Sequence, residues 1–119
     1  MALLNLDLTG NLAIDQGYEW RATLIYPGDF RLSQLRGKIF TSFEEDAEEL
    51  AAFQFRAAPF DKASQTTRIA IWLTATQTES LPLTEGNNRS VYQIRLTSSG
   101  RSPISLMRGS VQVLPVLPL

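Results

Sequence analysis

Carboxylates are the side chains of this sequence that come closest to a catalytic pattern. Five of the six residues from Glu44 to Glu49 are acidic, and a carboxylate pair can act as general acid and base without histidine. Such a pair needs one carboxyl removed from water, whereas this run is polar and predicts a solvated surface. It also lacks the alternating Asp/Asn spacing and the turn glycine of a calcium loop. We therefore predict neither a catalytic pair nor a metal site here.

The remaining sequence offers little other catalytic chemistry. The 119 residues include no cysteine and no histidine, which excludes thiol chemistry, zinc sites of the usual ligand types and imidazole bases. No nucleophile elbow, phosphate-binding loop or dinucleotide fingerprint is present. We predict that the protein is not an enzyme and needs no cofactor.

The basic side chains are mostly arginine, with nine arginines against two lysines. Arginine forms bidentate and stacked contacts, so this bias favours protein interfaces. Arg36, Arg95 and Arg108 are candidate contact residues, together with Arg21 and Arg56; the alternative is that all of them are ordinary outward-facing strand residues. The net charge of −1 argues against nucleic acid or an anionic membrane as partners of the whole chain.

The last residues, VLPVLPL, are apolar around two prolines. Such a segment is costly to leave in water, and proline excludes it from a central strand. We expect it either to cross the open end of its own domain or to dock on a neighbour. Leu114, Val116, Leu117 and Leu119 are therefore candidate contact residues, and 114–119 a possible apolar docking tail.

Alternating apolar and polar residues are the main structural signal. They predict strands at 4–8, 20–26, 37–43, 52–56, 69–73, 90–96 and 104–113, with a hairpin turn at 98–100 and a bulge or close backbone approach at Gly109. The acidic segment 44–53 is predicted to be a loop or a short helix. Thr74 and Gln77 have the spacing of a capping box, which predicts a short helical turn after the strand at 69–73.

Many short strands without a linker predict one all-β domain over 1–119, a small antiparallel β-sandwich of the immunoglobulin-like kind with one short helical turn. Five aromatic residues could stack on sugar rings, but in a sandwich this small they are expected mostly in the core: Tyr18, Trp20, Tyr26, Trp72 and Tyr92. Asn5 and Asp7 interrupt the apolar N-terminal segment, so we expect no signal peptide and no membrane span.

The order of several segments resembles the small β-sandwich domain of tail and baseplate proteins of tailed bacteriophages. The similar segments are IDQGYEWRATL, LRGKIF, IAIWLTATQTESL, VYQIRLTSSG and LMRGSVQVLP, within about residues 12–113. In place of that family's commoner Asp-Leu-Thr-Gly turn this chain has Gln34-Leu35-Arg36-Gly37. Many relatives continue into a fibre, whereas this sequence stops at Leu119.

The resemblance implies a structural virion subunit, an adaptor in the tail, baseplate or fibre attachment, made in the host cytoplasm. Its partners would be copies of itself, as a homo-oligomer, and other tail or baseplate proteins. The alternative is a carbohydrate-binding or host-adhesion module. That alternative requires at least two of the five aromatic residues to be exposed together beside Asn, Asp or Gln.

Overall fold

The computed structural model describes residues 10–30, 33–98 and 100–118 of the chain, in which eight strands and one short helix are present. The strands are β1 (Leu12–Asp15), β2 (Trp20–Pro27), β3 (Ser33–Phe40), β4 (Glu49–Ala52), β5 (Gln54–Ala57), β6 (Thr66–Leu73), β7 (Ser90–Ser98) and β8 (Ile104–Leu114). The helix α1 spans Ala75–Glu79. The strand predicted at 4–8 lies outside the described residues.

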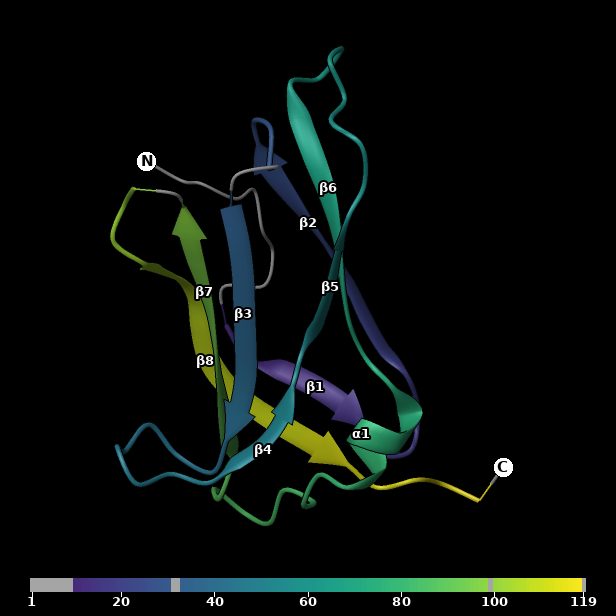
Figure 1. Cartoon of the computed structure of the whole chain (residues 1–119). Coiled ribbons are helices and arrows are strands. Elements are labelled where there is room, and N and C mark those ends of the chain that lie inside the picture. The colour runs from purple at the N-terminus through teal and green to yellow at the C-terminus, as the bar shows by residue number, and fades with distance from the viewer. Residues whose placement is uncertain (1–9, 31–32, 99, 119) are drawn as a thin grey trace.

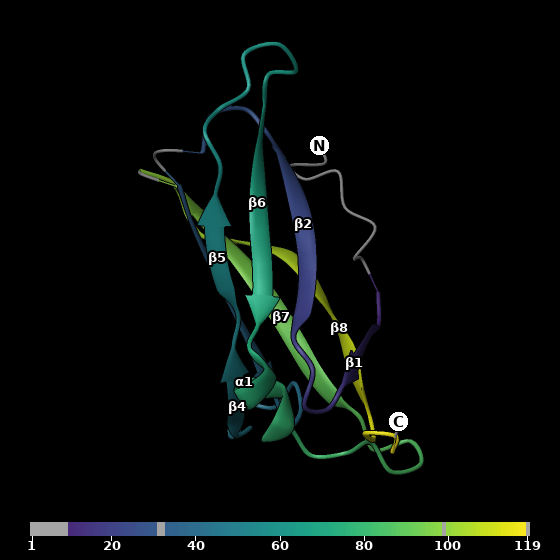
Figure 2. The same cartoon turned by 90° about the vertical axis from the view of Figure 1, so that its right-hand side faces the viewer.

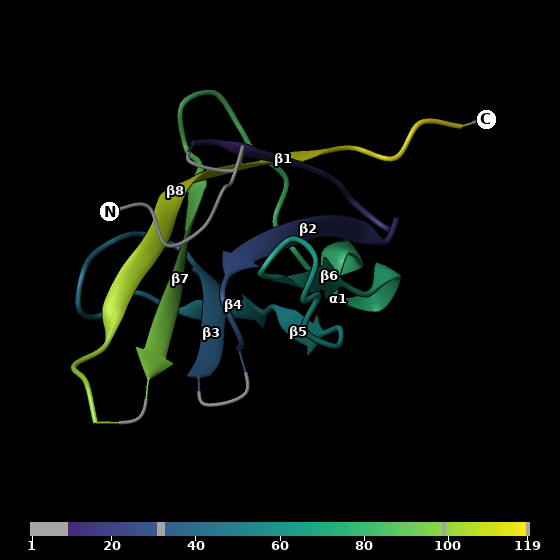
Figure 3. The same ribbon diagram turned by 90° about the horizontal axis from the view of Figure 1, so that it is seen from above.

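The strands form two sheets that pack face to face (Figures 1 and 2). One has five strands in the order β1-β8-β7-β3-β4, and the other has three in the order β2-β6-β5. Seen from above, in Figure 3, the two sheets lie side by side as two layers. The predicted fold class, a small immunoglobulin-like β-sandwich with one short helical turn, is confirmed.

The core lies between the sheets because each strand turns alternate side chains inward. Ile39, Tyr92 and Val111 from the larger sheet and Leu24 and Ile71 from the smaller one are fully buried. Fully burying a large apolar side chain contributes roughly 1.5–3 kcal/mol. The outward-facing positions of the same strands are available to polar and charged side chains.

One pair of strands departs from the antiparallel pattern. β1 pairs with β8 in parallel, with Leu12 opposite Val111 and Ile14 opposite Val113. These two strands are far apart in the sequence, so no hairpin constrains their direction. Alternation alone could not indicate this pairing.

The segment predicted as one strand at 52–56 is divided between the two sheets. β4 ends at Ala52 and belongs to the larger sheet, whereas β5 begins at Gln54 and belongs to the smaller one. Phe53 connects them, and its backbone N–H donates to the carbonyl oxygen of Gly37 at 2.9 Å. The Phe53 ring is buried against Trp20 and Tyr92, which explains why the chain crosses here. Residues 44–48 form a loop, as predicted, but the prediction of a loop or short helix over 44–53 is wrong from Glu49 onward, where β4 begins.

Two local predictions are confirmed by the backbone. The Thr74 hydroxyl accepts from the N–H of Gln77 at 3.2 Å, and the Gln77 side chain accepts from the N–H of Thr74 at 2.9 Å, which completes the capping box of α1. At Gly109 a Cβ atom would lie 2.4 Å from the carbonyl oxygen of Gly10. This glycine therefore marks the close backbone approach that its position in a strand predicts.

Candidate functional site

The charged residues are segregated between strands and loops. Seven cations lie on strands with exposed side chains: Arg21, Arg36, Lys38, Arg56, Arg68, Arg95 and Arg108. Only two acids lie on the described strands, Asp15 at the end of β1 and Glu49 at the start of β4. The net charge of −1 therefore conceals two sheet faces that are basic and loops that are acidic.

The outer face of the five-stranded sheet carries the larger group of cations. Arg36 of β3 stands directly opposite Arg95 of β7, and Lys38 stands opposite Gln93. Successive side chains of a strand point to opposite faces of the sheet. These side chains therefore point outward, while Ile39, Tyr92 and Ile94 point into the core. Arg108 of β8 continues the row, opposite Gln93.

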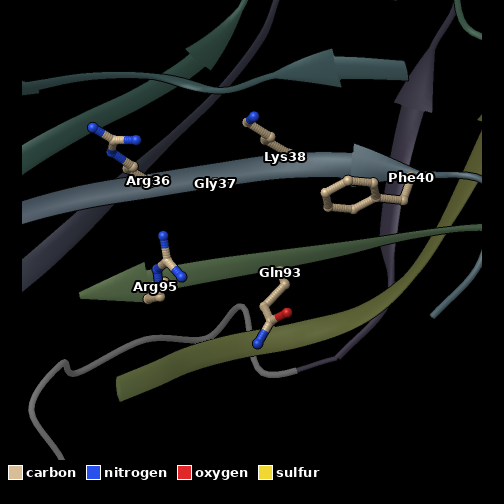
Figure 4. Close-up of a pocket in the computed structure, with 6 residues that line it drawn as sticks. All are labelled: Arg36, Gly37, Lys38, Phe40, Gln93 and Arg95. Carbon is tan, nitrogen blue, oxygen red and sulfur yellow. The ribbon is translucent and has the colours of Figure 1, made fainter. Parts of the chain in front are cut away.

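These side chains surround a shallow hollow on the sheet (Figure 4), lined by Arg36, Gly37, Lys38, Phe40, Gln93 and Arg95. Its volume of about 260 Å³ lies just below the roughly 300–1,000 Å³ of typical small-molecule sites. It therefore suits one small group rather than an extended ligand. Figure 4 shows both arginine side chains raised from the ribbon, the Arg95 guanidinium directed toward β3 and the Arg36 guanidinium on the side of β3 away from β7.

The partners of these polar side chains differ. Lys38 Nζ lies 2.6 Å from a carboxylate oxygen of Glu49. The Gln93 amide donates to the hydroxyl of Ser105 of β8 at 3.1 Å, and its side chain leans toward that strand (Figure 4). Among the described residues, neither Arg36 nor Arg95 has an acidic partner within ion-pair distance.

Two like charges directly opposite each other on paired strands destabilise a sheet. A carboxylate placed between two guanidinium groups would remove that repulsion and accept up to four hydrogen bonds. The Arg36–Arg95 pair is therefore an arrangement whose charge is compensated when an anion binds. This property distinguishes it from the paired Lys38.

Gly37 explains how the backbone under the hollow can approach the core. A Cβ atom at this position would lie 2.8 Å from Ile94 Cγ1 and 3.0 Å from Phe53 Cδ2. Only glycine allows the rings of Phe53 and Phe55 to come this close beneath β3. Arg36 and Lys38 are consequently held on a strand that is packed tightly from below.

A cation–π contact extends the site toward the loop between β3 and β4. The Arg108 guanidinium carbon lies 4.5 Å from the centre of the Phe43 ring. This contact fixes Phe43 against the outer side of β8, although half of its side chain stays exposed. The acidic residues that follow Phe43 are thereby held beside the basic face.

The predicted contact residues fall into two separate groups. Arg36 and Arg95 are brought together, and Arg108 lies on the same face. Leu114 is the half-buried last residue of β8, paired with Asp15, so the exposed part of the predicted tail begins after it. Val116 and Leu117 are 51% and 65% exposed. Leu119 lies outside the described residues.

The five aromatic residues are placed largely as predicted. Tyr92 is fully buried, and Trp20 and Tyr26 pack against the core. Trp72 is half-buried on the outer side of β6, and Tyr18 is 48% exposed at the turn before β2. No two of the five are exposed together, so sugar stacking on these particular rings is not supported.

Sequence reasoning missed four residues of the hollow: Gly37, Lys38, Phe40 and Gln93. The alternation of the strands could have indicated the side chains among them. Lys38 and Phe40 point to the same face of β3 as Arg36, and Gln93 points to the same face of β7 as Arg95. What no pattern could supply was the pairing of β3 with β7, whose strands are separated by half of the chain. That pairing creates the site.

The acidic run is solvated, as predicted, since Glu44, Glu45, Asp46, Glu48 and Glu49 are all exposed. Within the described ranges, no three Asp or Glu side chains gather where one metal ion could bind them all. The same ranges contain no helix long and apolar enough to cross a bilayer.

Comparisons with known proteins give the fold and no family. No protein-family model matches the sequence, and no curated protein matches it. Among solved structures, the sialic acid binding region of a Streptococcus sanguinis SK1 adhesin, bound to 3′sLn, matches with a TM-score of 0.51 at 11% identity. The match covers 94% of this chain but only 29% of the adhesin chain.

Two further solved structures are similar at a lower level. A VGSC beta subunit, solved in work on multimeric cell-adhesive interactions, has a TM-score of 0.48 at 12% identity over 89% of this chain and 93% of its own. The BTLA ectodomain has a TM-score of 0.49 at 9% identity over 96% of this chain and 99% of its own. At these identities the likeness is one of fold alone.

Proposed function

We propose that this protein is a non-catalytic recognition module of the adhesion type, which binds the carboxylate of an acidic glycan between Arg36 and Arg95. One observation carries the proposal: two exposed guanidinium groups stand opposite each other at a hollow, with no acidic partner among the described residues. A carboxylate is the planar anion that arginine binds best in a bidentate manner.

The other residues of the hollow suit a sugar that carries this carboxylate. The Gln93 carbonyl oxygen can accept a hydrogen bond from a sugar hydroxyl. The Phe40 ring supplies an apolar wall at the end of the hollow away from Arg36. The small volume admits a single terminal sugar residue, so the rest of a glycan would extend into solvent.

The ligand class is suggested by the adhesin region that shares this fold and was solved with a sialylated ligand. That likeness supplies a reason to test sialic acid first, while the residues of this chain supply the binding chemistry. The aromatic platform that the sequence required for a carbohydrate site is replaced here by an arginine pair and one phenylalanine.

Calorimetric titration with 3′-sialyllactose and with lactose tests the proposal. We expect binding of the sialylated sugar only, weakened at least tenfold by Arg36→Gln or Arg95→Gln, because each substitution removes one charged donor from the carboxylate. Arg56→Gln is the matched control, since Arg56 is exposed on the outer face of the other sheet. Equal binding of both sugars, or equal loss in the control, would refute the proposed site.

A second candidate function is a structural subunit of a phage tail or baseplate, which we propose on the ordered resemblance of the segments. The exposed Val116 and Leu117 favour it, because apolar side chains past the end of β8 gain stability when a neighbour covers them. None of the three solved structures named above is a phage protein.

Light scattering on the full chain and on a version truncated after Leu114 tests this second function. A discrete oligomer that becomes a monomer on truncation would support assembly through residues 115–119. Two monomers of equal stability would remove that support.

A further inference from the structure

The outer face of the five-stranded sheet is polarised along its strands. Arg36 and Arg95 lie near the middle of β3 and β7, and the loop that follows Phe40 carries the acids Glu44, Glu45, Asp46 and Glu48 at one end of the face. Phe40 lies four positions along β3 from Arg36, or about 13 Å at the usual rise per residue. One face therefore presents both signs of charge at a fixed spacing.

The acidic loop has a defined shape. Thr41 N–H donates to the carbonyl oxygen of Glu48 at 3.0 Å, and Glu48 N–H donates to the Thr41 hydroxyl at 3.1 Å. Ala47 N–H closes an inner turn on the carbonyl oxygen of Glu44 at 3.1 Å. With Phe43 held under Arg108, the loop extends from β3 toward β8 along the lower end of the face.

Neither charged cluster has an ion-pair partner among the described residues. Glu44, Glu45, Asp46 and Glu48 are exposed and form no ion pair with any described residue, and the same holds for Arg36 and Arg95. Like charges repel one another within each cluster, and a surface of opposite charge would reduce that repulsion. The two clusters are complementary in sign and lie on one side of the molecule.

We propose that this face binds the same face of a second copy of the chain. A two-fold axis in the plane of contact, running across the strands near Phe40, would reverse the strand direction of the second copy. The acidic loop of each copy would then cover the Arg36–Arg95 pair of the other. Such an interface is self-complementary, as a closed dimer requires.

The middle of the face adds apolar contact. Phe43 is 52% exposed, and Phe40 is half-buried on the same side. Individual exposed ion pairs are weak and are screened by salt, so the dimer is expected to be reversible and strongest at low ionic strength. A standard interface buries about 800 Å² on each partner, which requires most of this sheet face.

Dimerisation would also control the glycan site, a consequence that rests on the proposed function. The loop carboxylates of the second copy would occupy the guanidinium groups that bind the sugar carboxylate. The sugar and the second copy would then compete. The self-association itself requires no glycan and is tested without one.

Sedimentation velocity at low and high salt, with charge-reversed variants, tests the dimer. We expect dimers of the wild type at low salt and monomers at 0.5 M salt. A face variant, Arg36→Glu with Arg95→Glu, and a loop variant, Glu44→Lys with Glu45→Lys and Asp46→Lys, should each be monomeric. Mixed in equal amounts they should form a heterodimer, because both contacts regain opposite charges.

The control is Arg56→Glu with Arg68→Glu, which reverses two exposed charges on the other sheet and should leave the dimer intact. Far-UV circular dichroism checks that each variant is folded, and Arg36→Gln with Arg95→Gln replaces the face variant if it is not. A wild type that is monomeric at low salt overturns the proposal, and so does a mixture that stays monomeric. If the dimer forms but 3′-sialyllactose does not dissociate it, the glycan proposal fails and the dimer stands.

Discussion

The end of the sandwich near α1 and the outer face of the five-stranded sheet treat polar groups in opposite ways. At α1, the fully buried Thr78 hydroxyl donates to the carbonyl oxygen of Tyr18 at 2.8 Å and accepts from the N–H of Gly17 at 3.1 Å. On the outer face, Arg36 and Arg95 have no acidic partner among the described residues.

This difference distinguishes the polar groups that stabilise the fold from those that are available to bind a ligand. The polar groups around α1 satisfy one another, so removing one leaves a buried group without a partner. The Gln77 side chain makes a separate contact, in which its amide donates to the carbonyl oxygen of Ala52 at 2.8 Å. Arg36 and Arg95 form no ion pair with a described residue, so their charges are available to a ligand.

The largest effect is expected at Thr78. Thr78→Val keeps the shape of the side chain but leaves the Gly17 N–H and the Tyr18 carbonyl oxygen without their partner. We expect the free energy of unfolding to fall by about 2–3 kcal/mol, measured by urea denaturation. Thr76→Val, an exposed position of the same helix, should change it by less than about 0.5 kcal/mol. Equal losses of stability in the two variants would show that the hydrogen bonds of Thr78 do not account for its contribution.

The helix cap should have an intermediate effect. Thr74→Ala removes the hydroxyl that accepts from the Gln77 N–H and should cost about 1 kcal/mol in the same assay. Thr74→Ser keeps a hydroxyl at this position and should restore most of the loss. A serine variant as unstable as the alanine variant would contradict the role of the cap.

A titration to alkaline pH tests the buried Tyr92 side chain beneath the outer face of the five-stranded sheet. Burial raises the pKa of the Tyr92 hydroxyl above its ordinary value of 10.0, and this hydroxyl donates to the carbonyl oxygen of Gly10 at 2.8 Å. The folded protein therefore holds this proton more tightly than the unfolded chain. Stability should be complete below pH 10 and should fall as the pH rises through the raised pKa.

Tyr92→Phe provides the comparison for this titration. The variant loses the Gly10 hydrogen bond at every pH, and its free energy of unfolding should decline less than that of the wild type above pH 10. Parallel declines in thermal unfolding midpoints across that range would assign the alkaline loss to other groups.

The smallest effect on stability is expected on the outer face. Arg36→Gln should change the free energy of unfolding by less than about 0.5 kcal/mol, in the stabilising direction, because it removes a repulsion with Arg95. The same variant should lose ligand binding. A loss of stability comparable to that of Thr78→Val would show that Arg36 stabilises the fold. It would contradict the difference proposed between the two regions.

The local elements could be predicted from the sequence because their causes are local. Thr74 and Gln77 define the capping box by spacing alone, and the alternation from Trp20 to Tyr26 and from Ile69 to Leu73 specifies half-buried strands. Gly109 similarly indicates a close approach, although only the structure identifies Gly10 as the neighbour.

The features that were missed depend on contacts between distant segments. The parallel pairing of β1 with β8 and the change of sheet at Phe53 follow from core packing that no alternation encodes. The same holds for the site: Arg36 and Arg95 were candidates as arginines, but their direct opposition depends on the register of β3 and β7. Lys38 and Gln93 join the site only through that register.

Amide chemical shifts measured by NMR during a titration with 3′-sialyllactose test the account most directly. The experiment is run at 0.5 M salt, where the chain is expected to be monomeric, with lactose as the reference. We predict shifts confined to β3 and β7 around Arg36, Lys38, Gln93 and Arg95, absent with lactose and absent in Arg36→Gln with Arg95→Gln. Shifts of equal size around α1 or on β2, β5 and β6, or no shifts at all, would contradict the assignment of this face as the binding site.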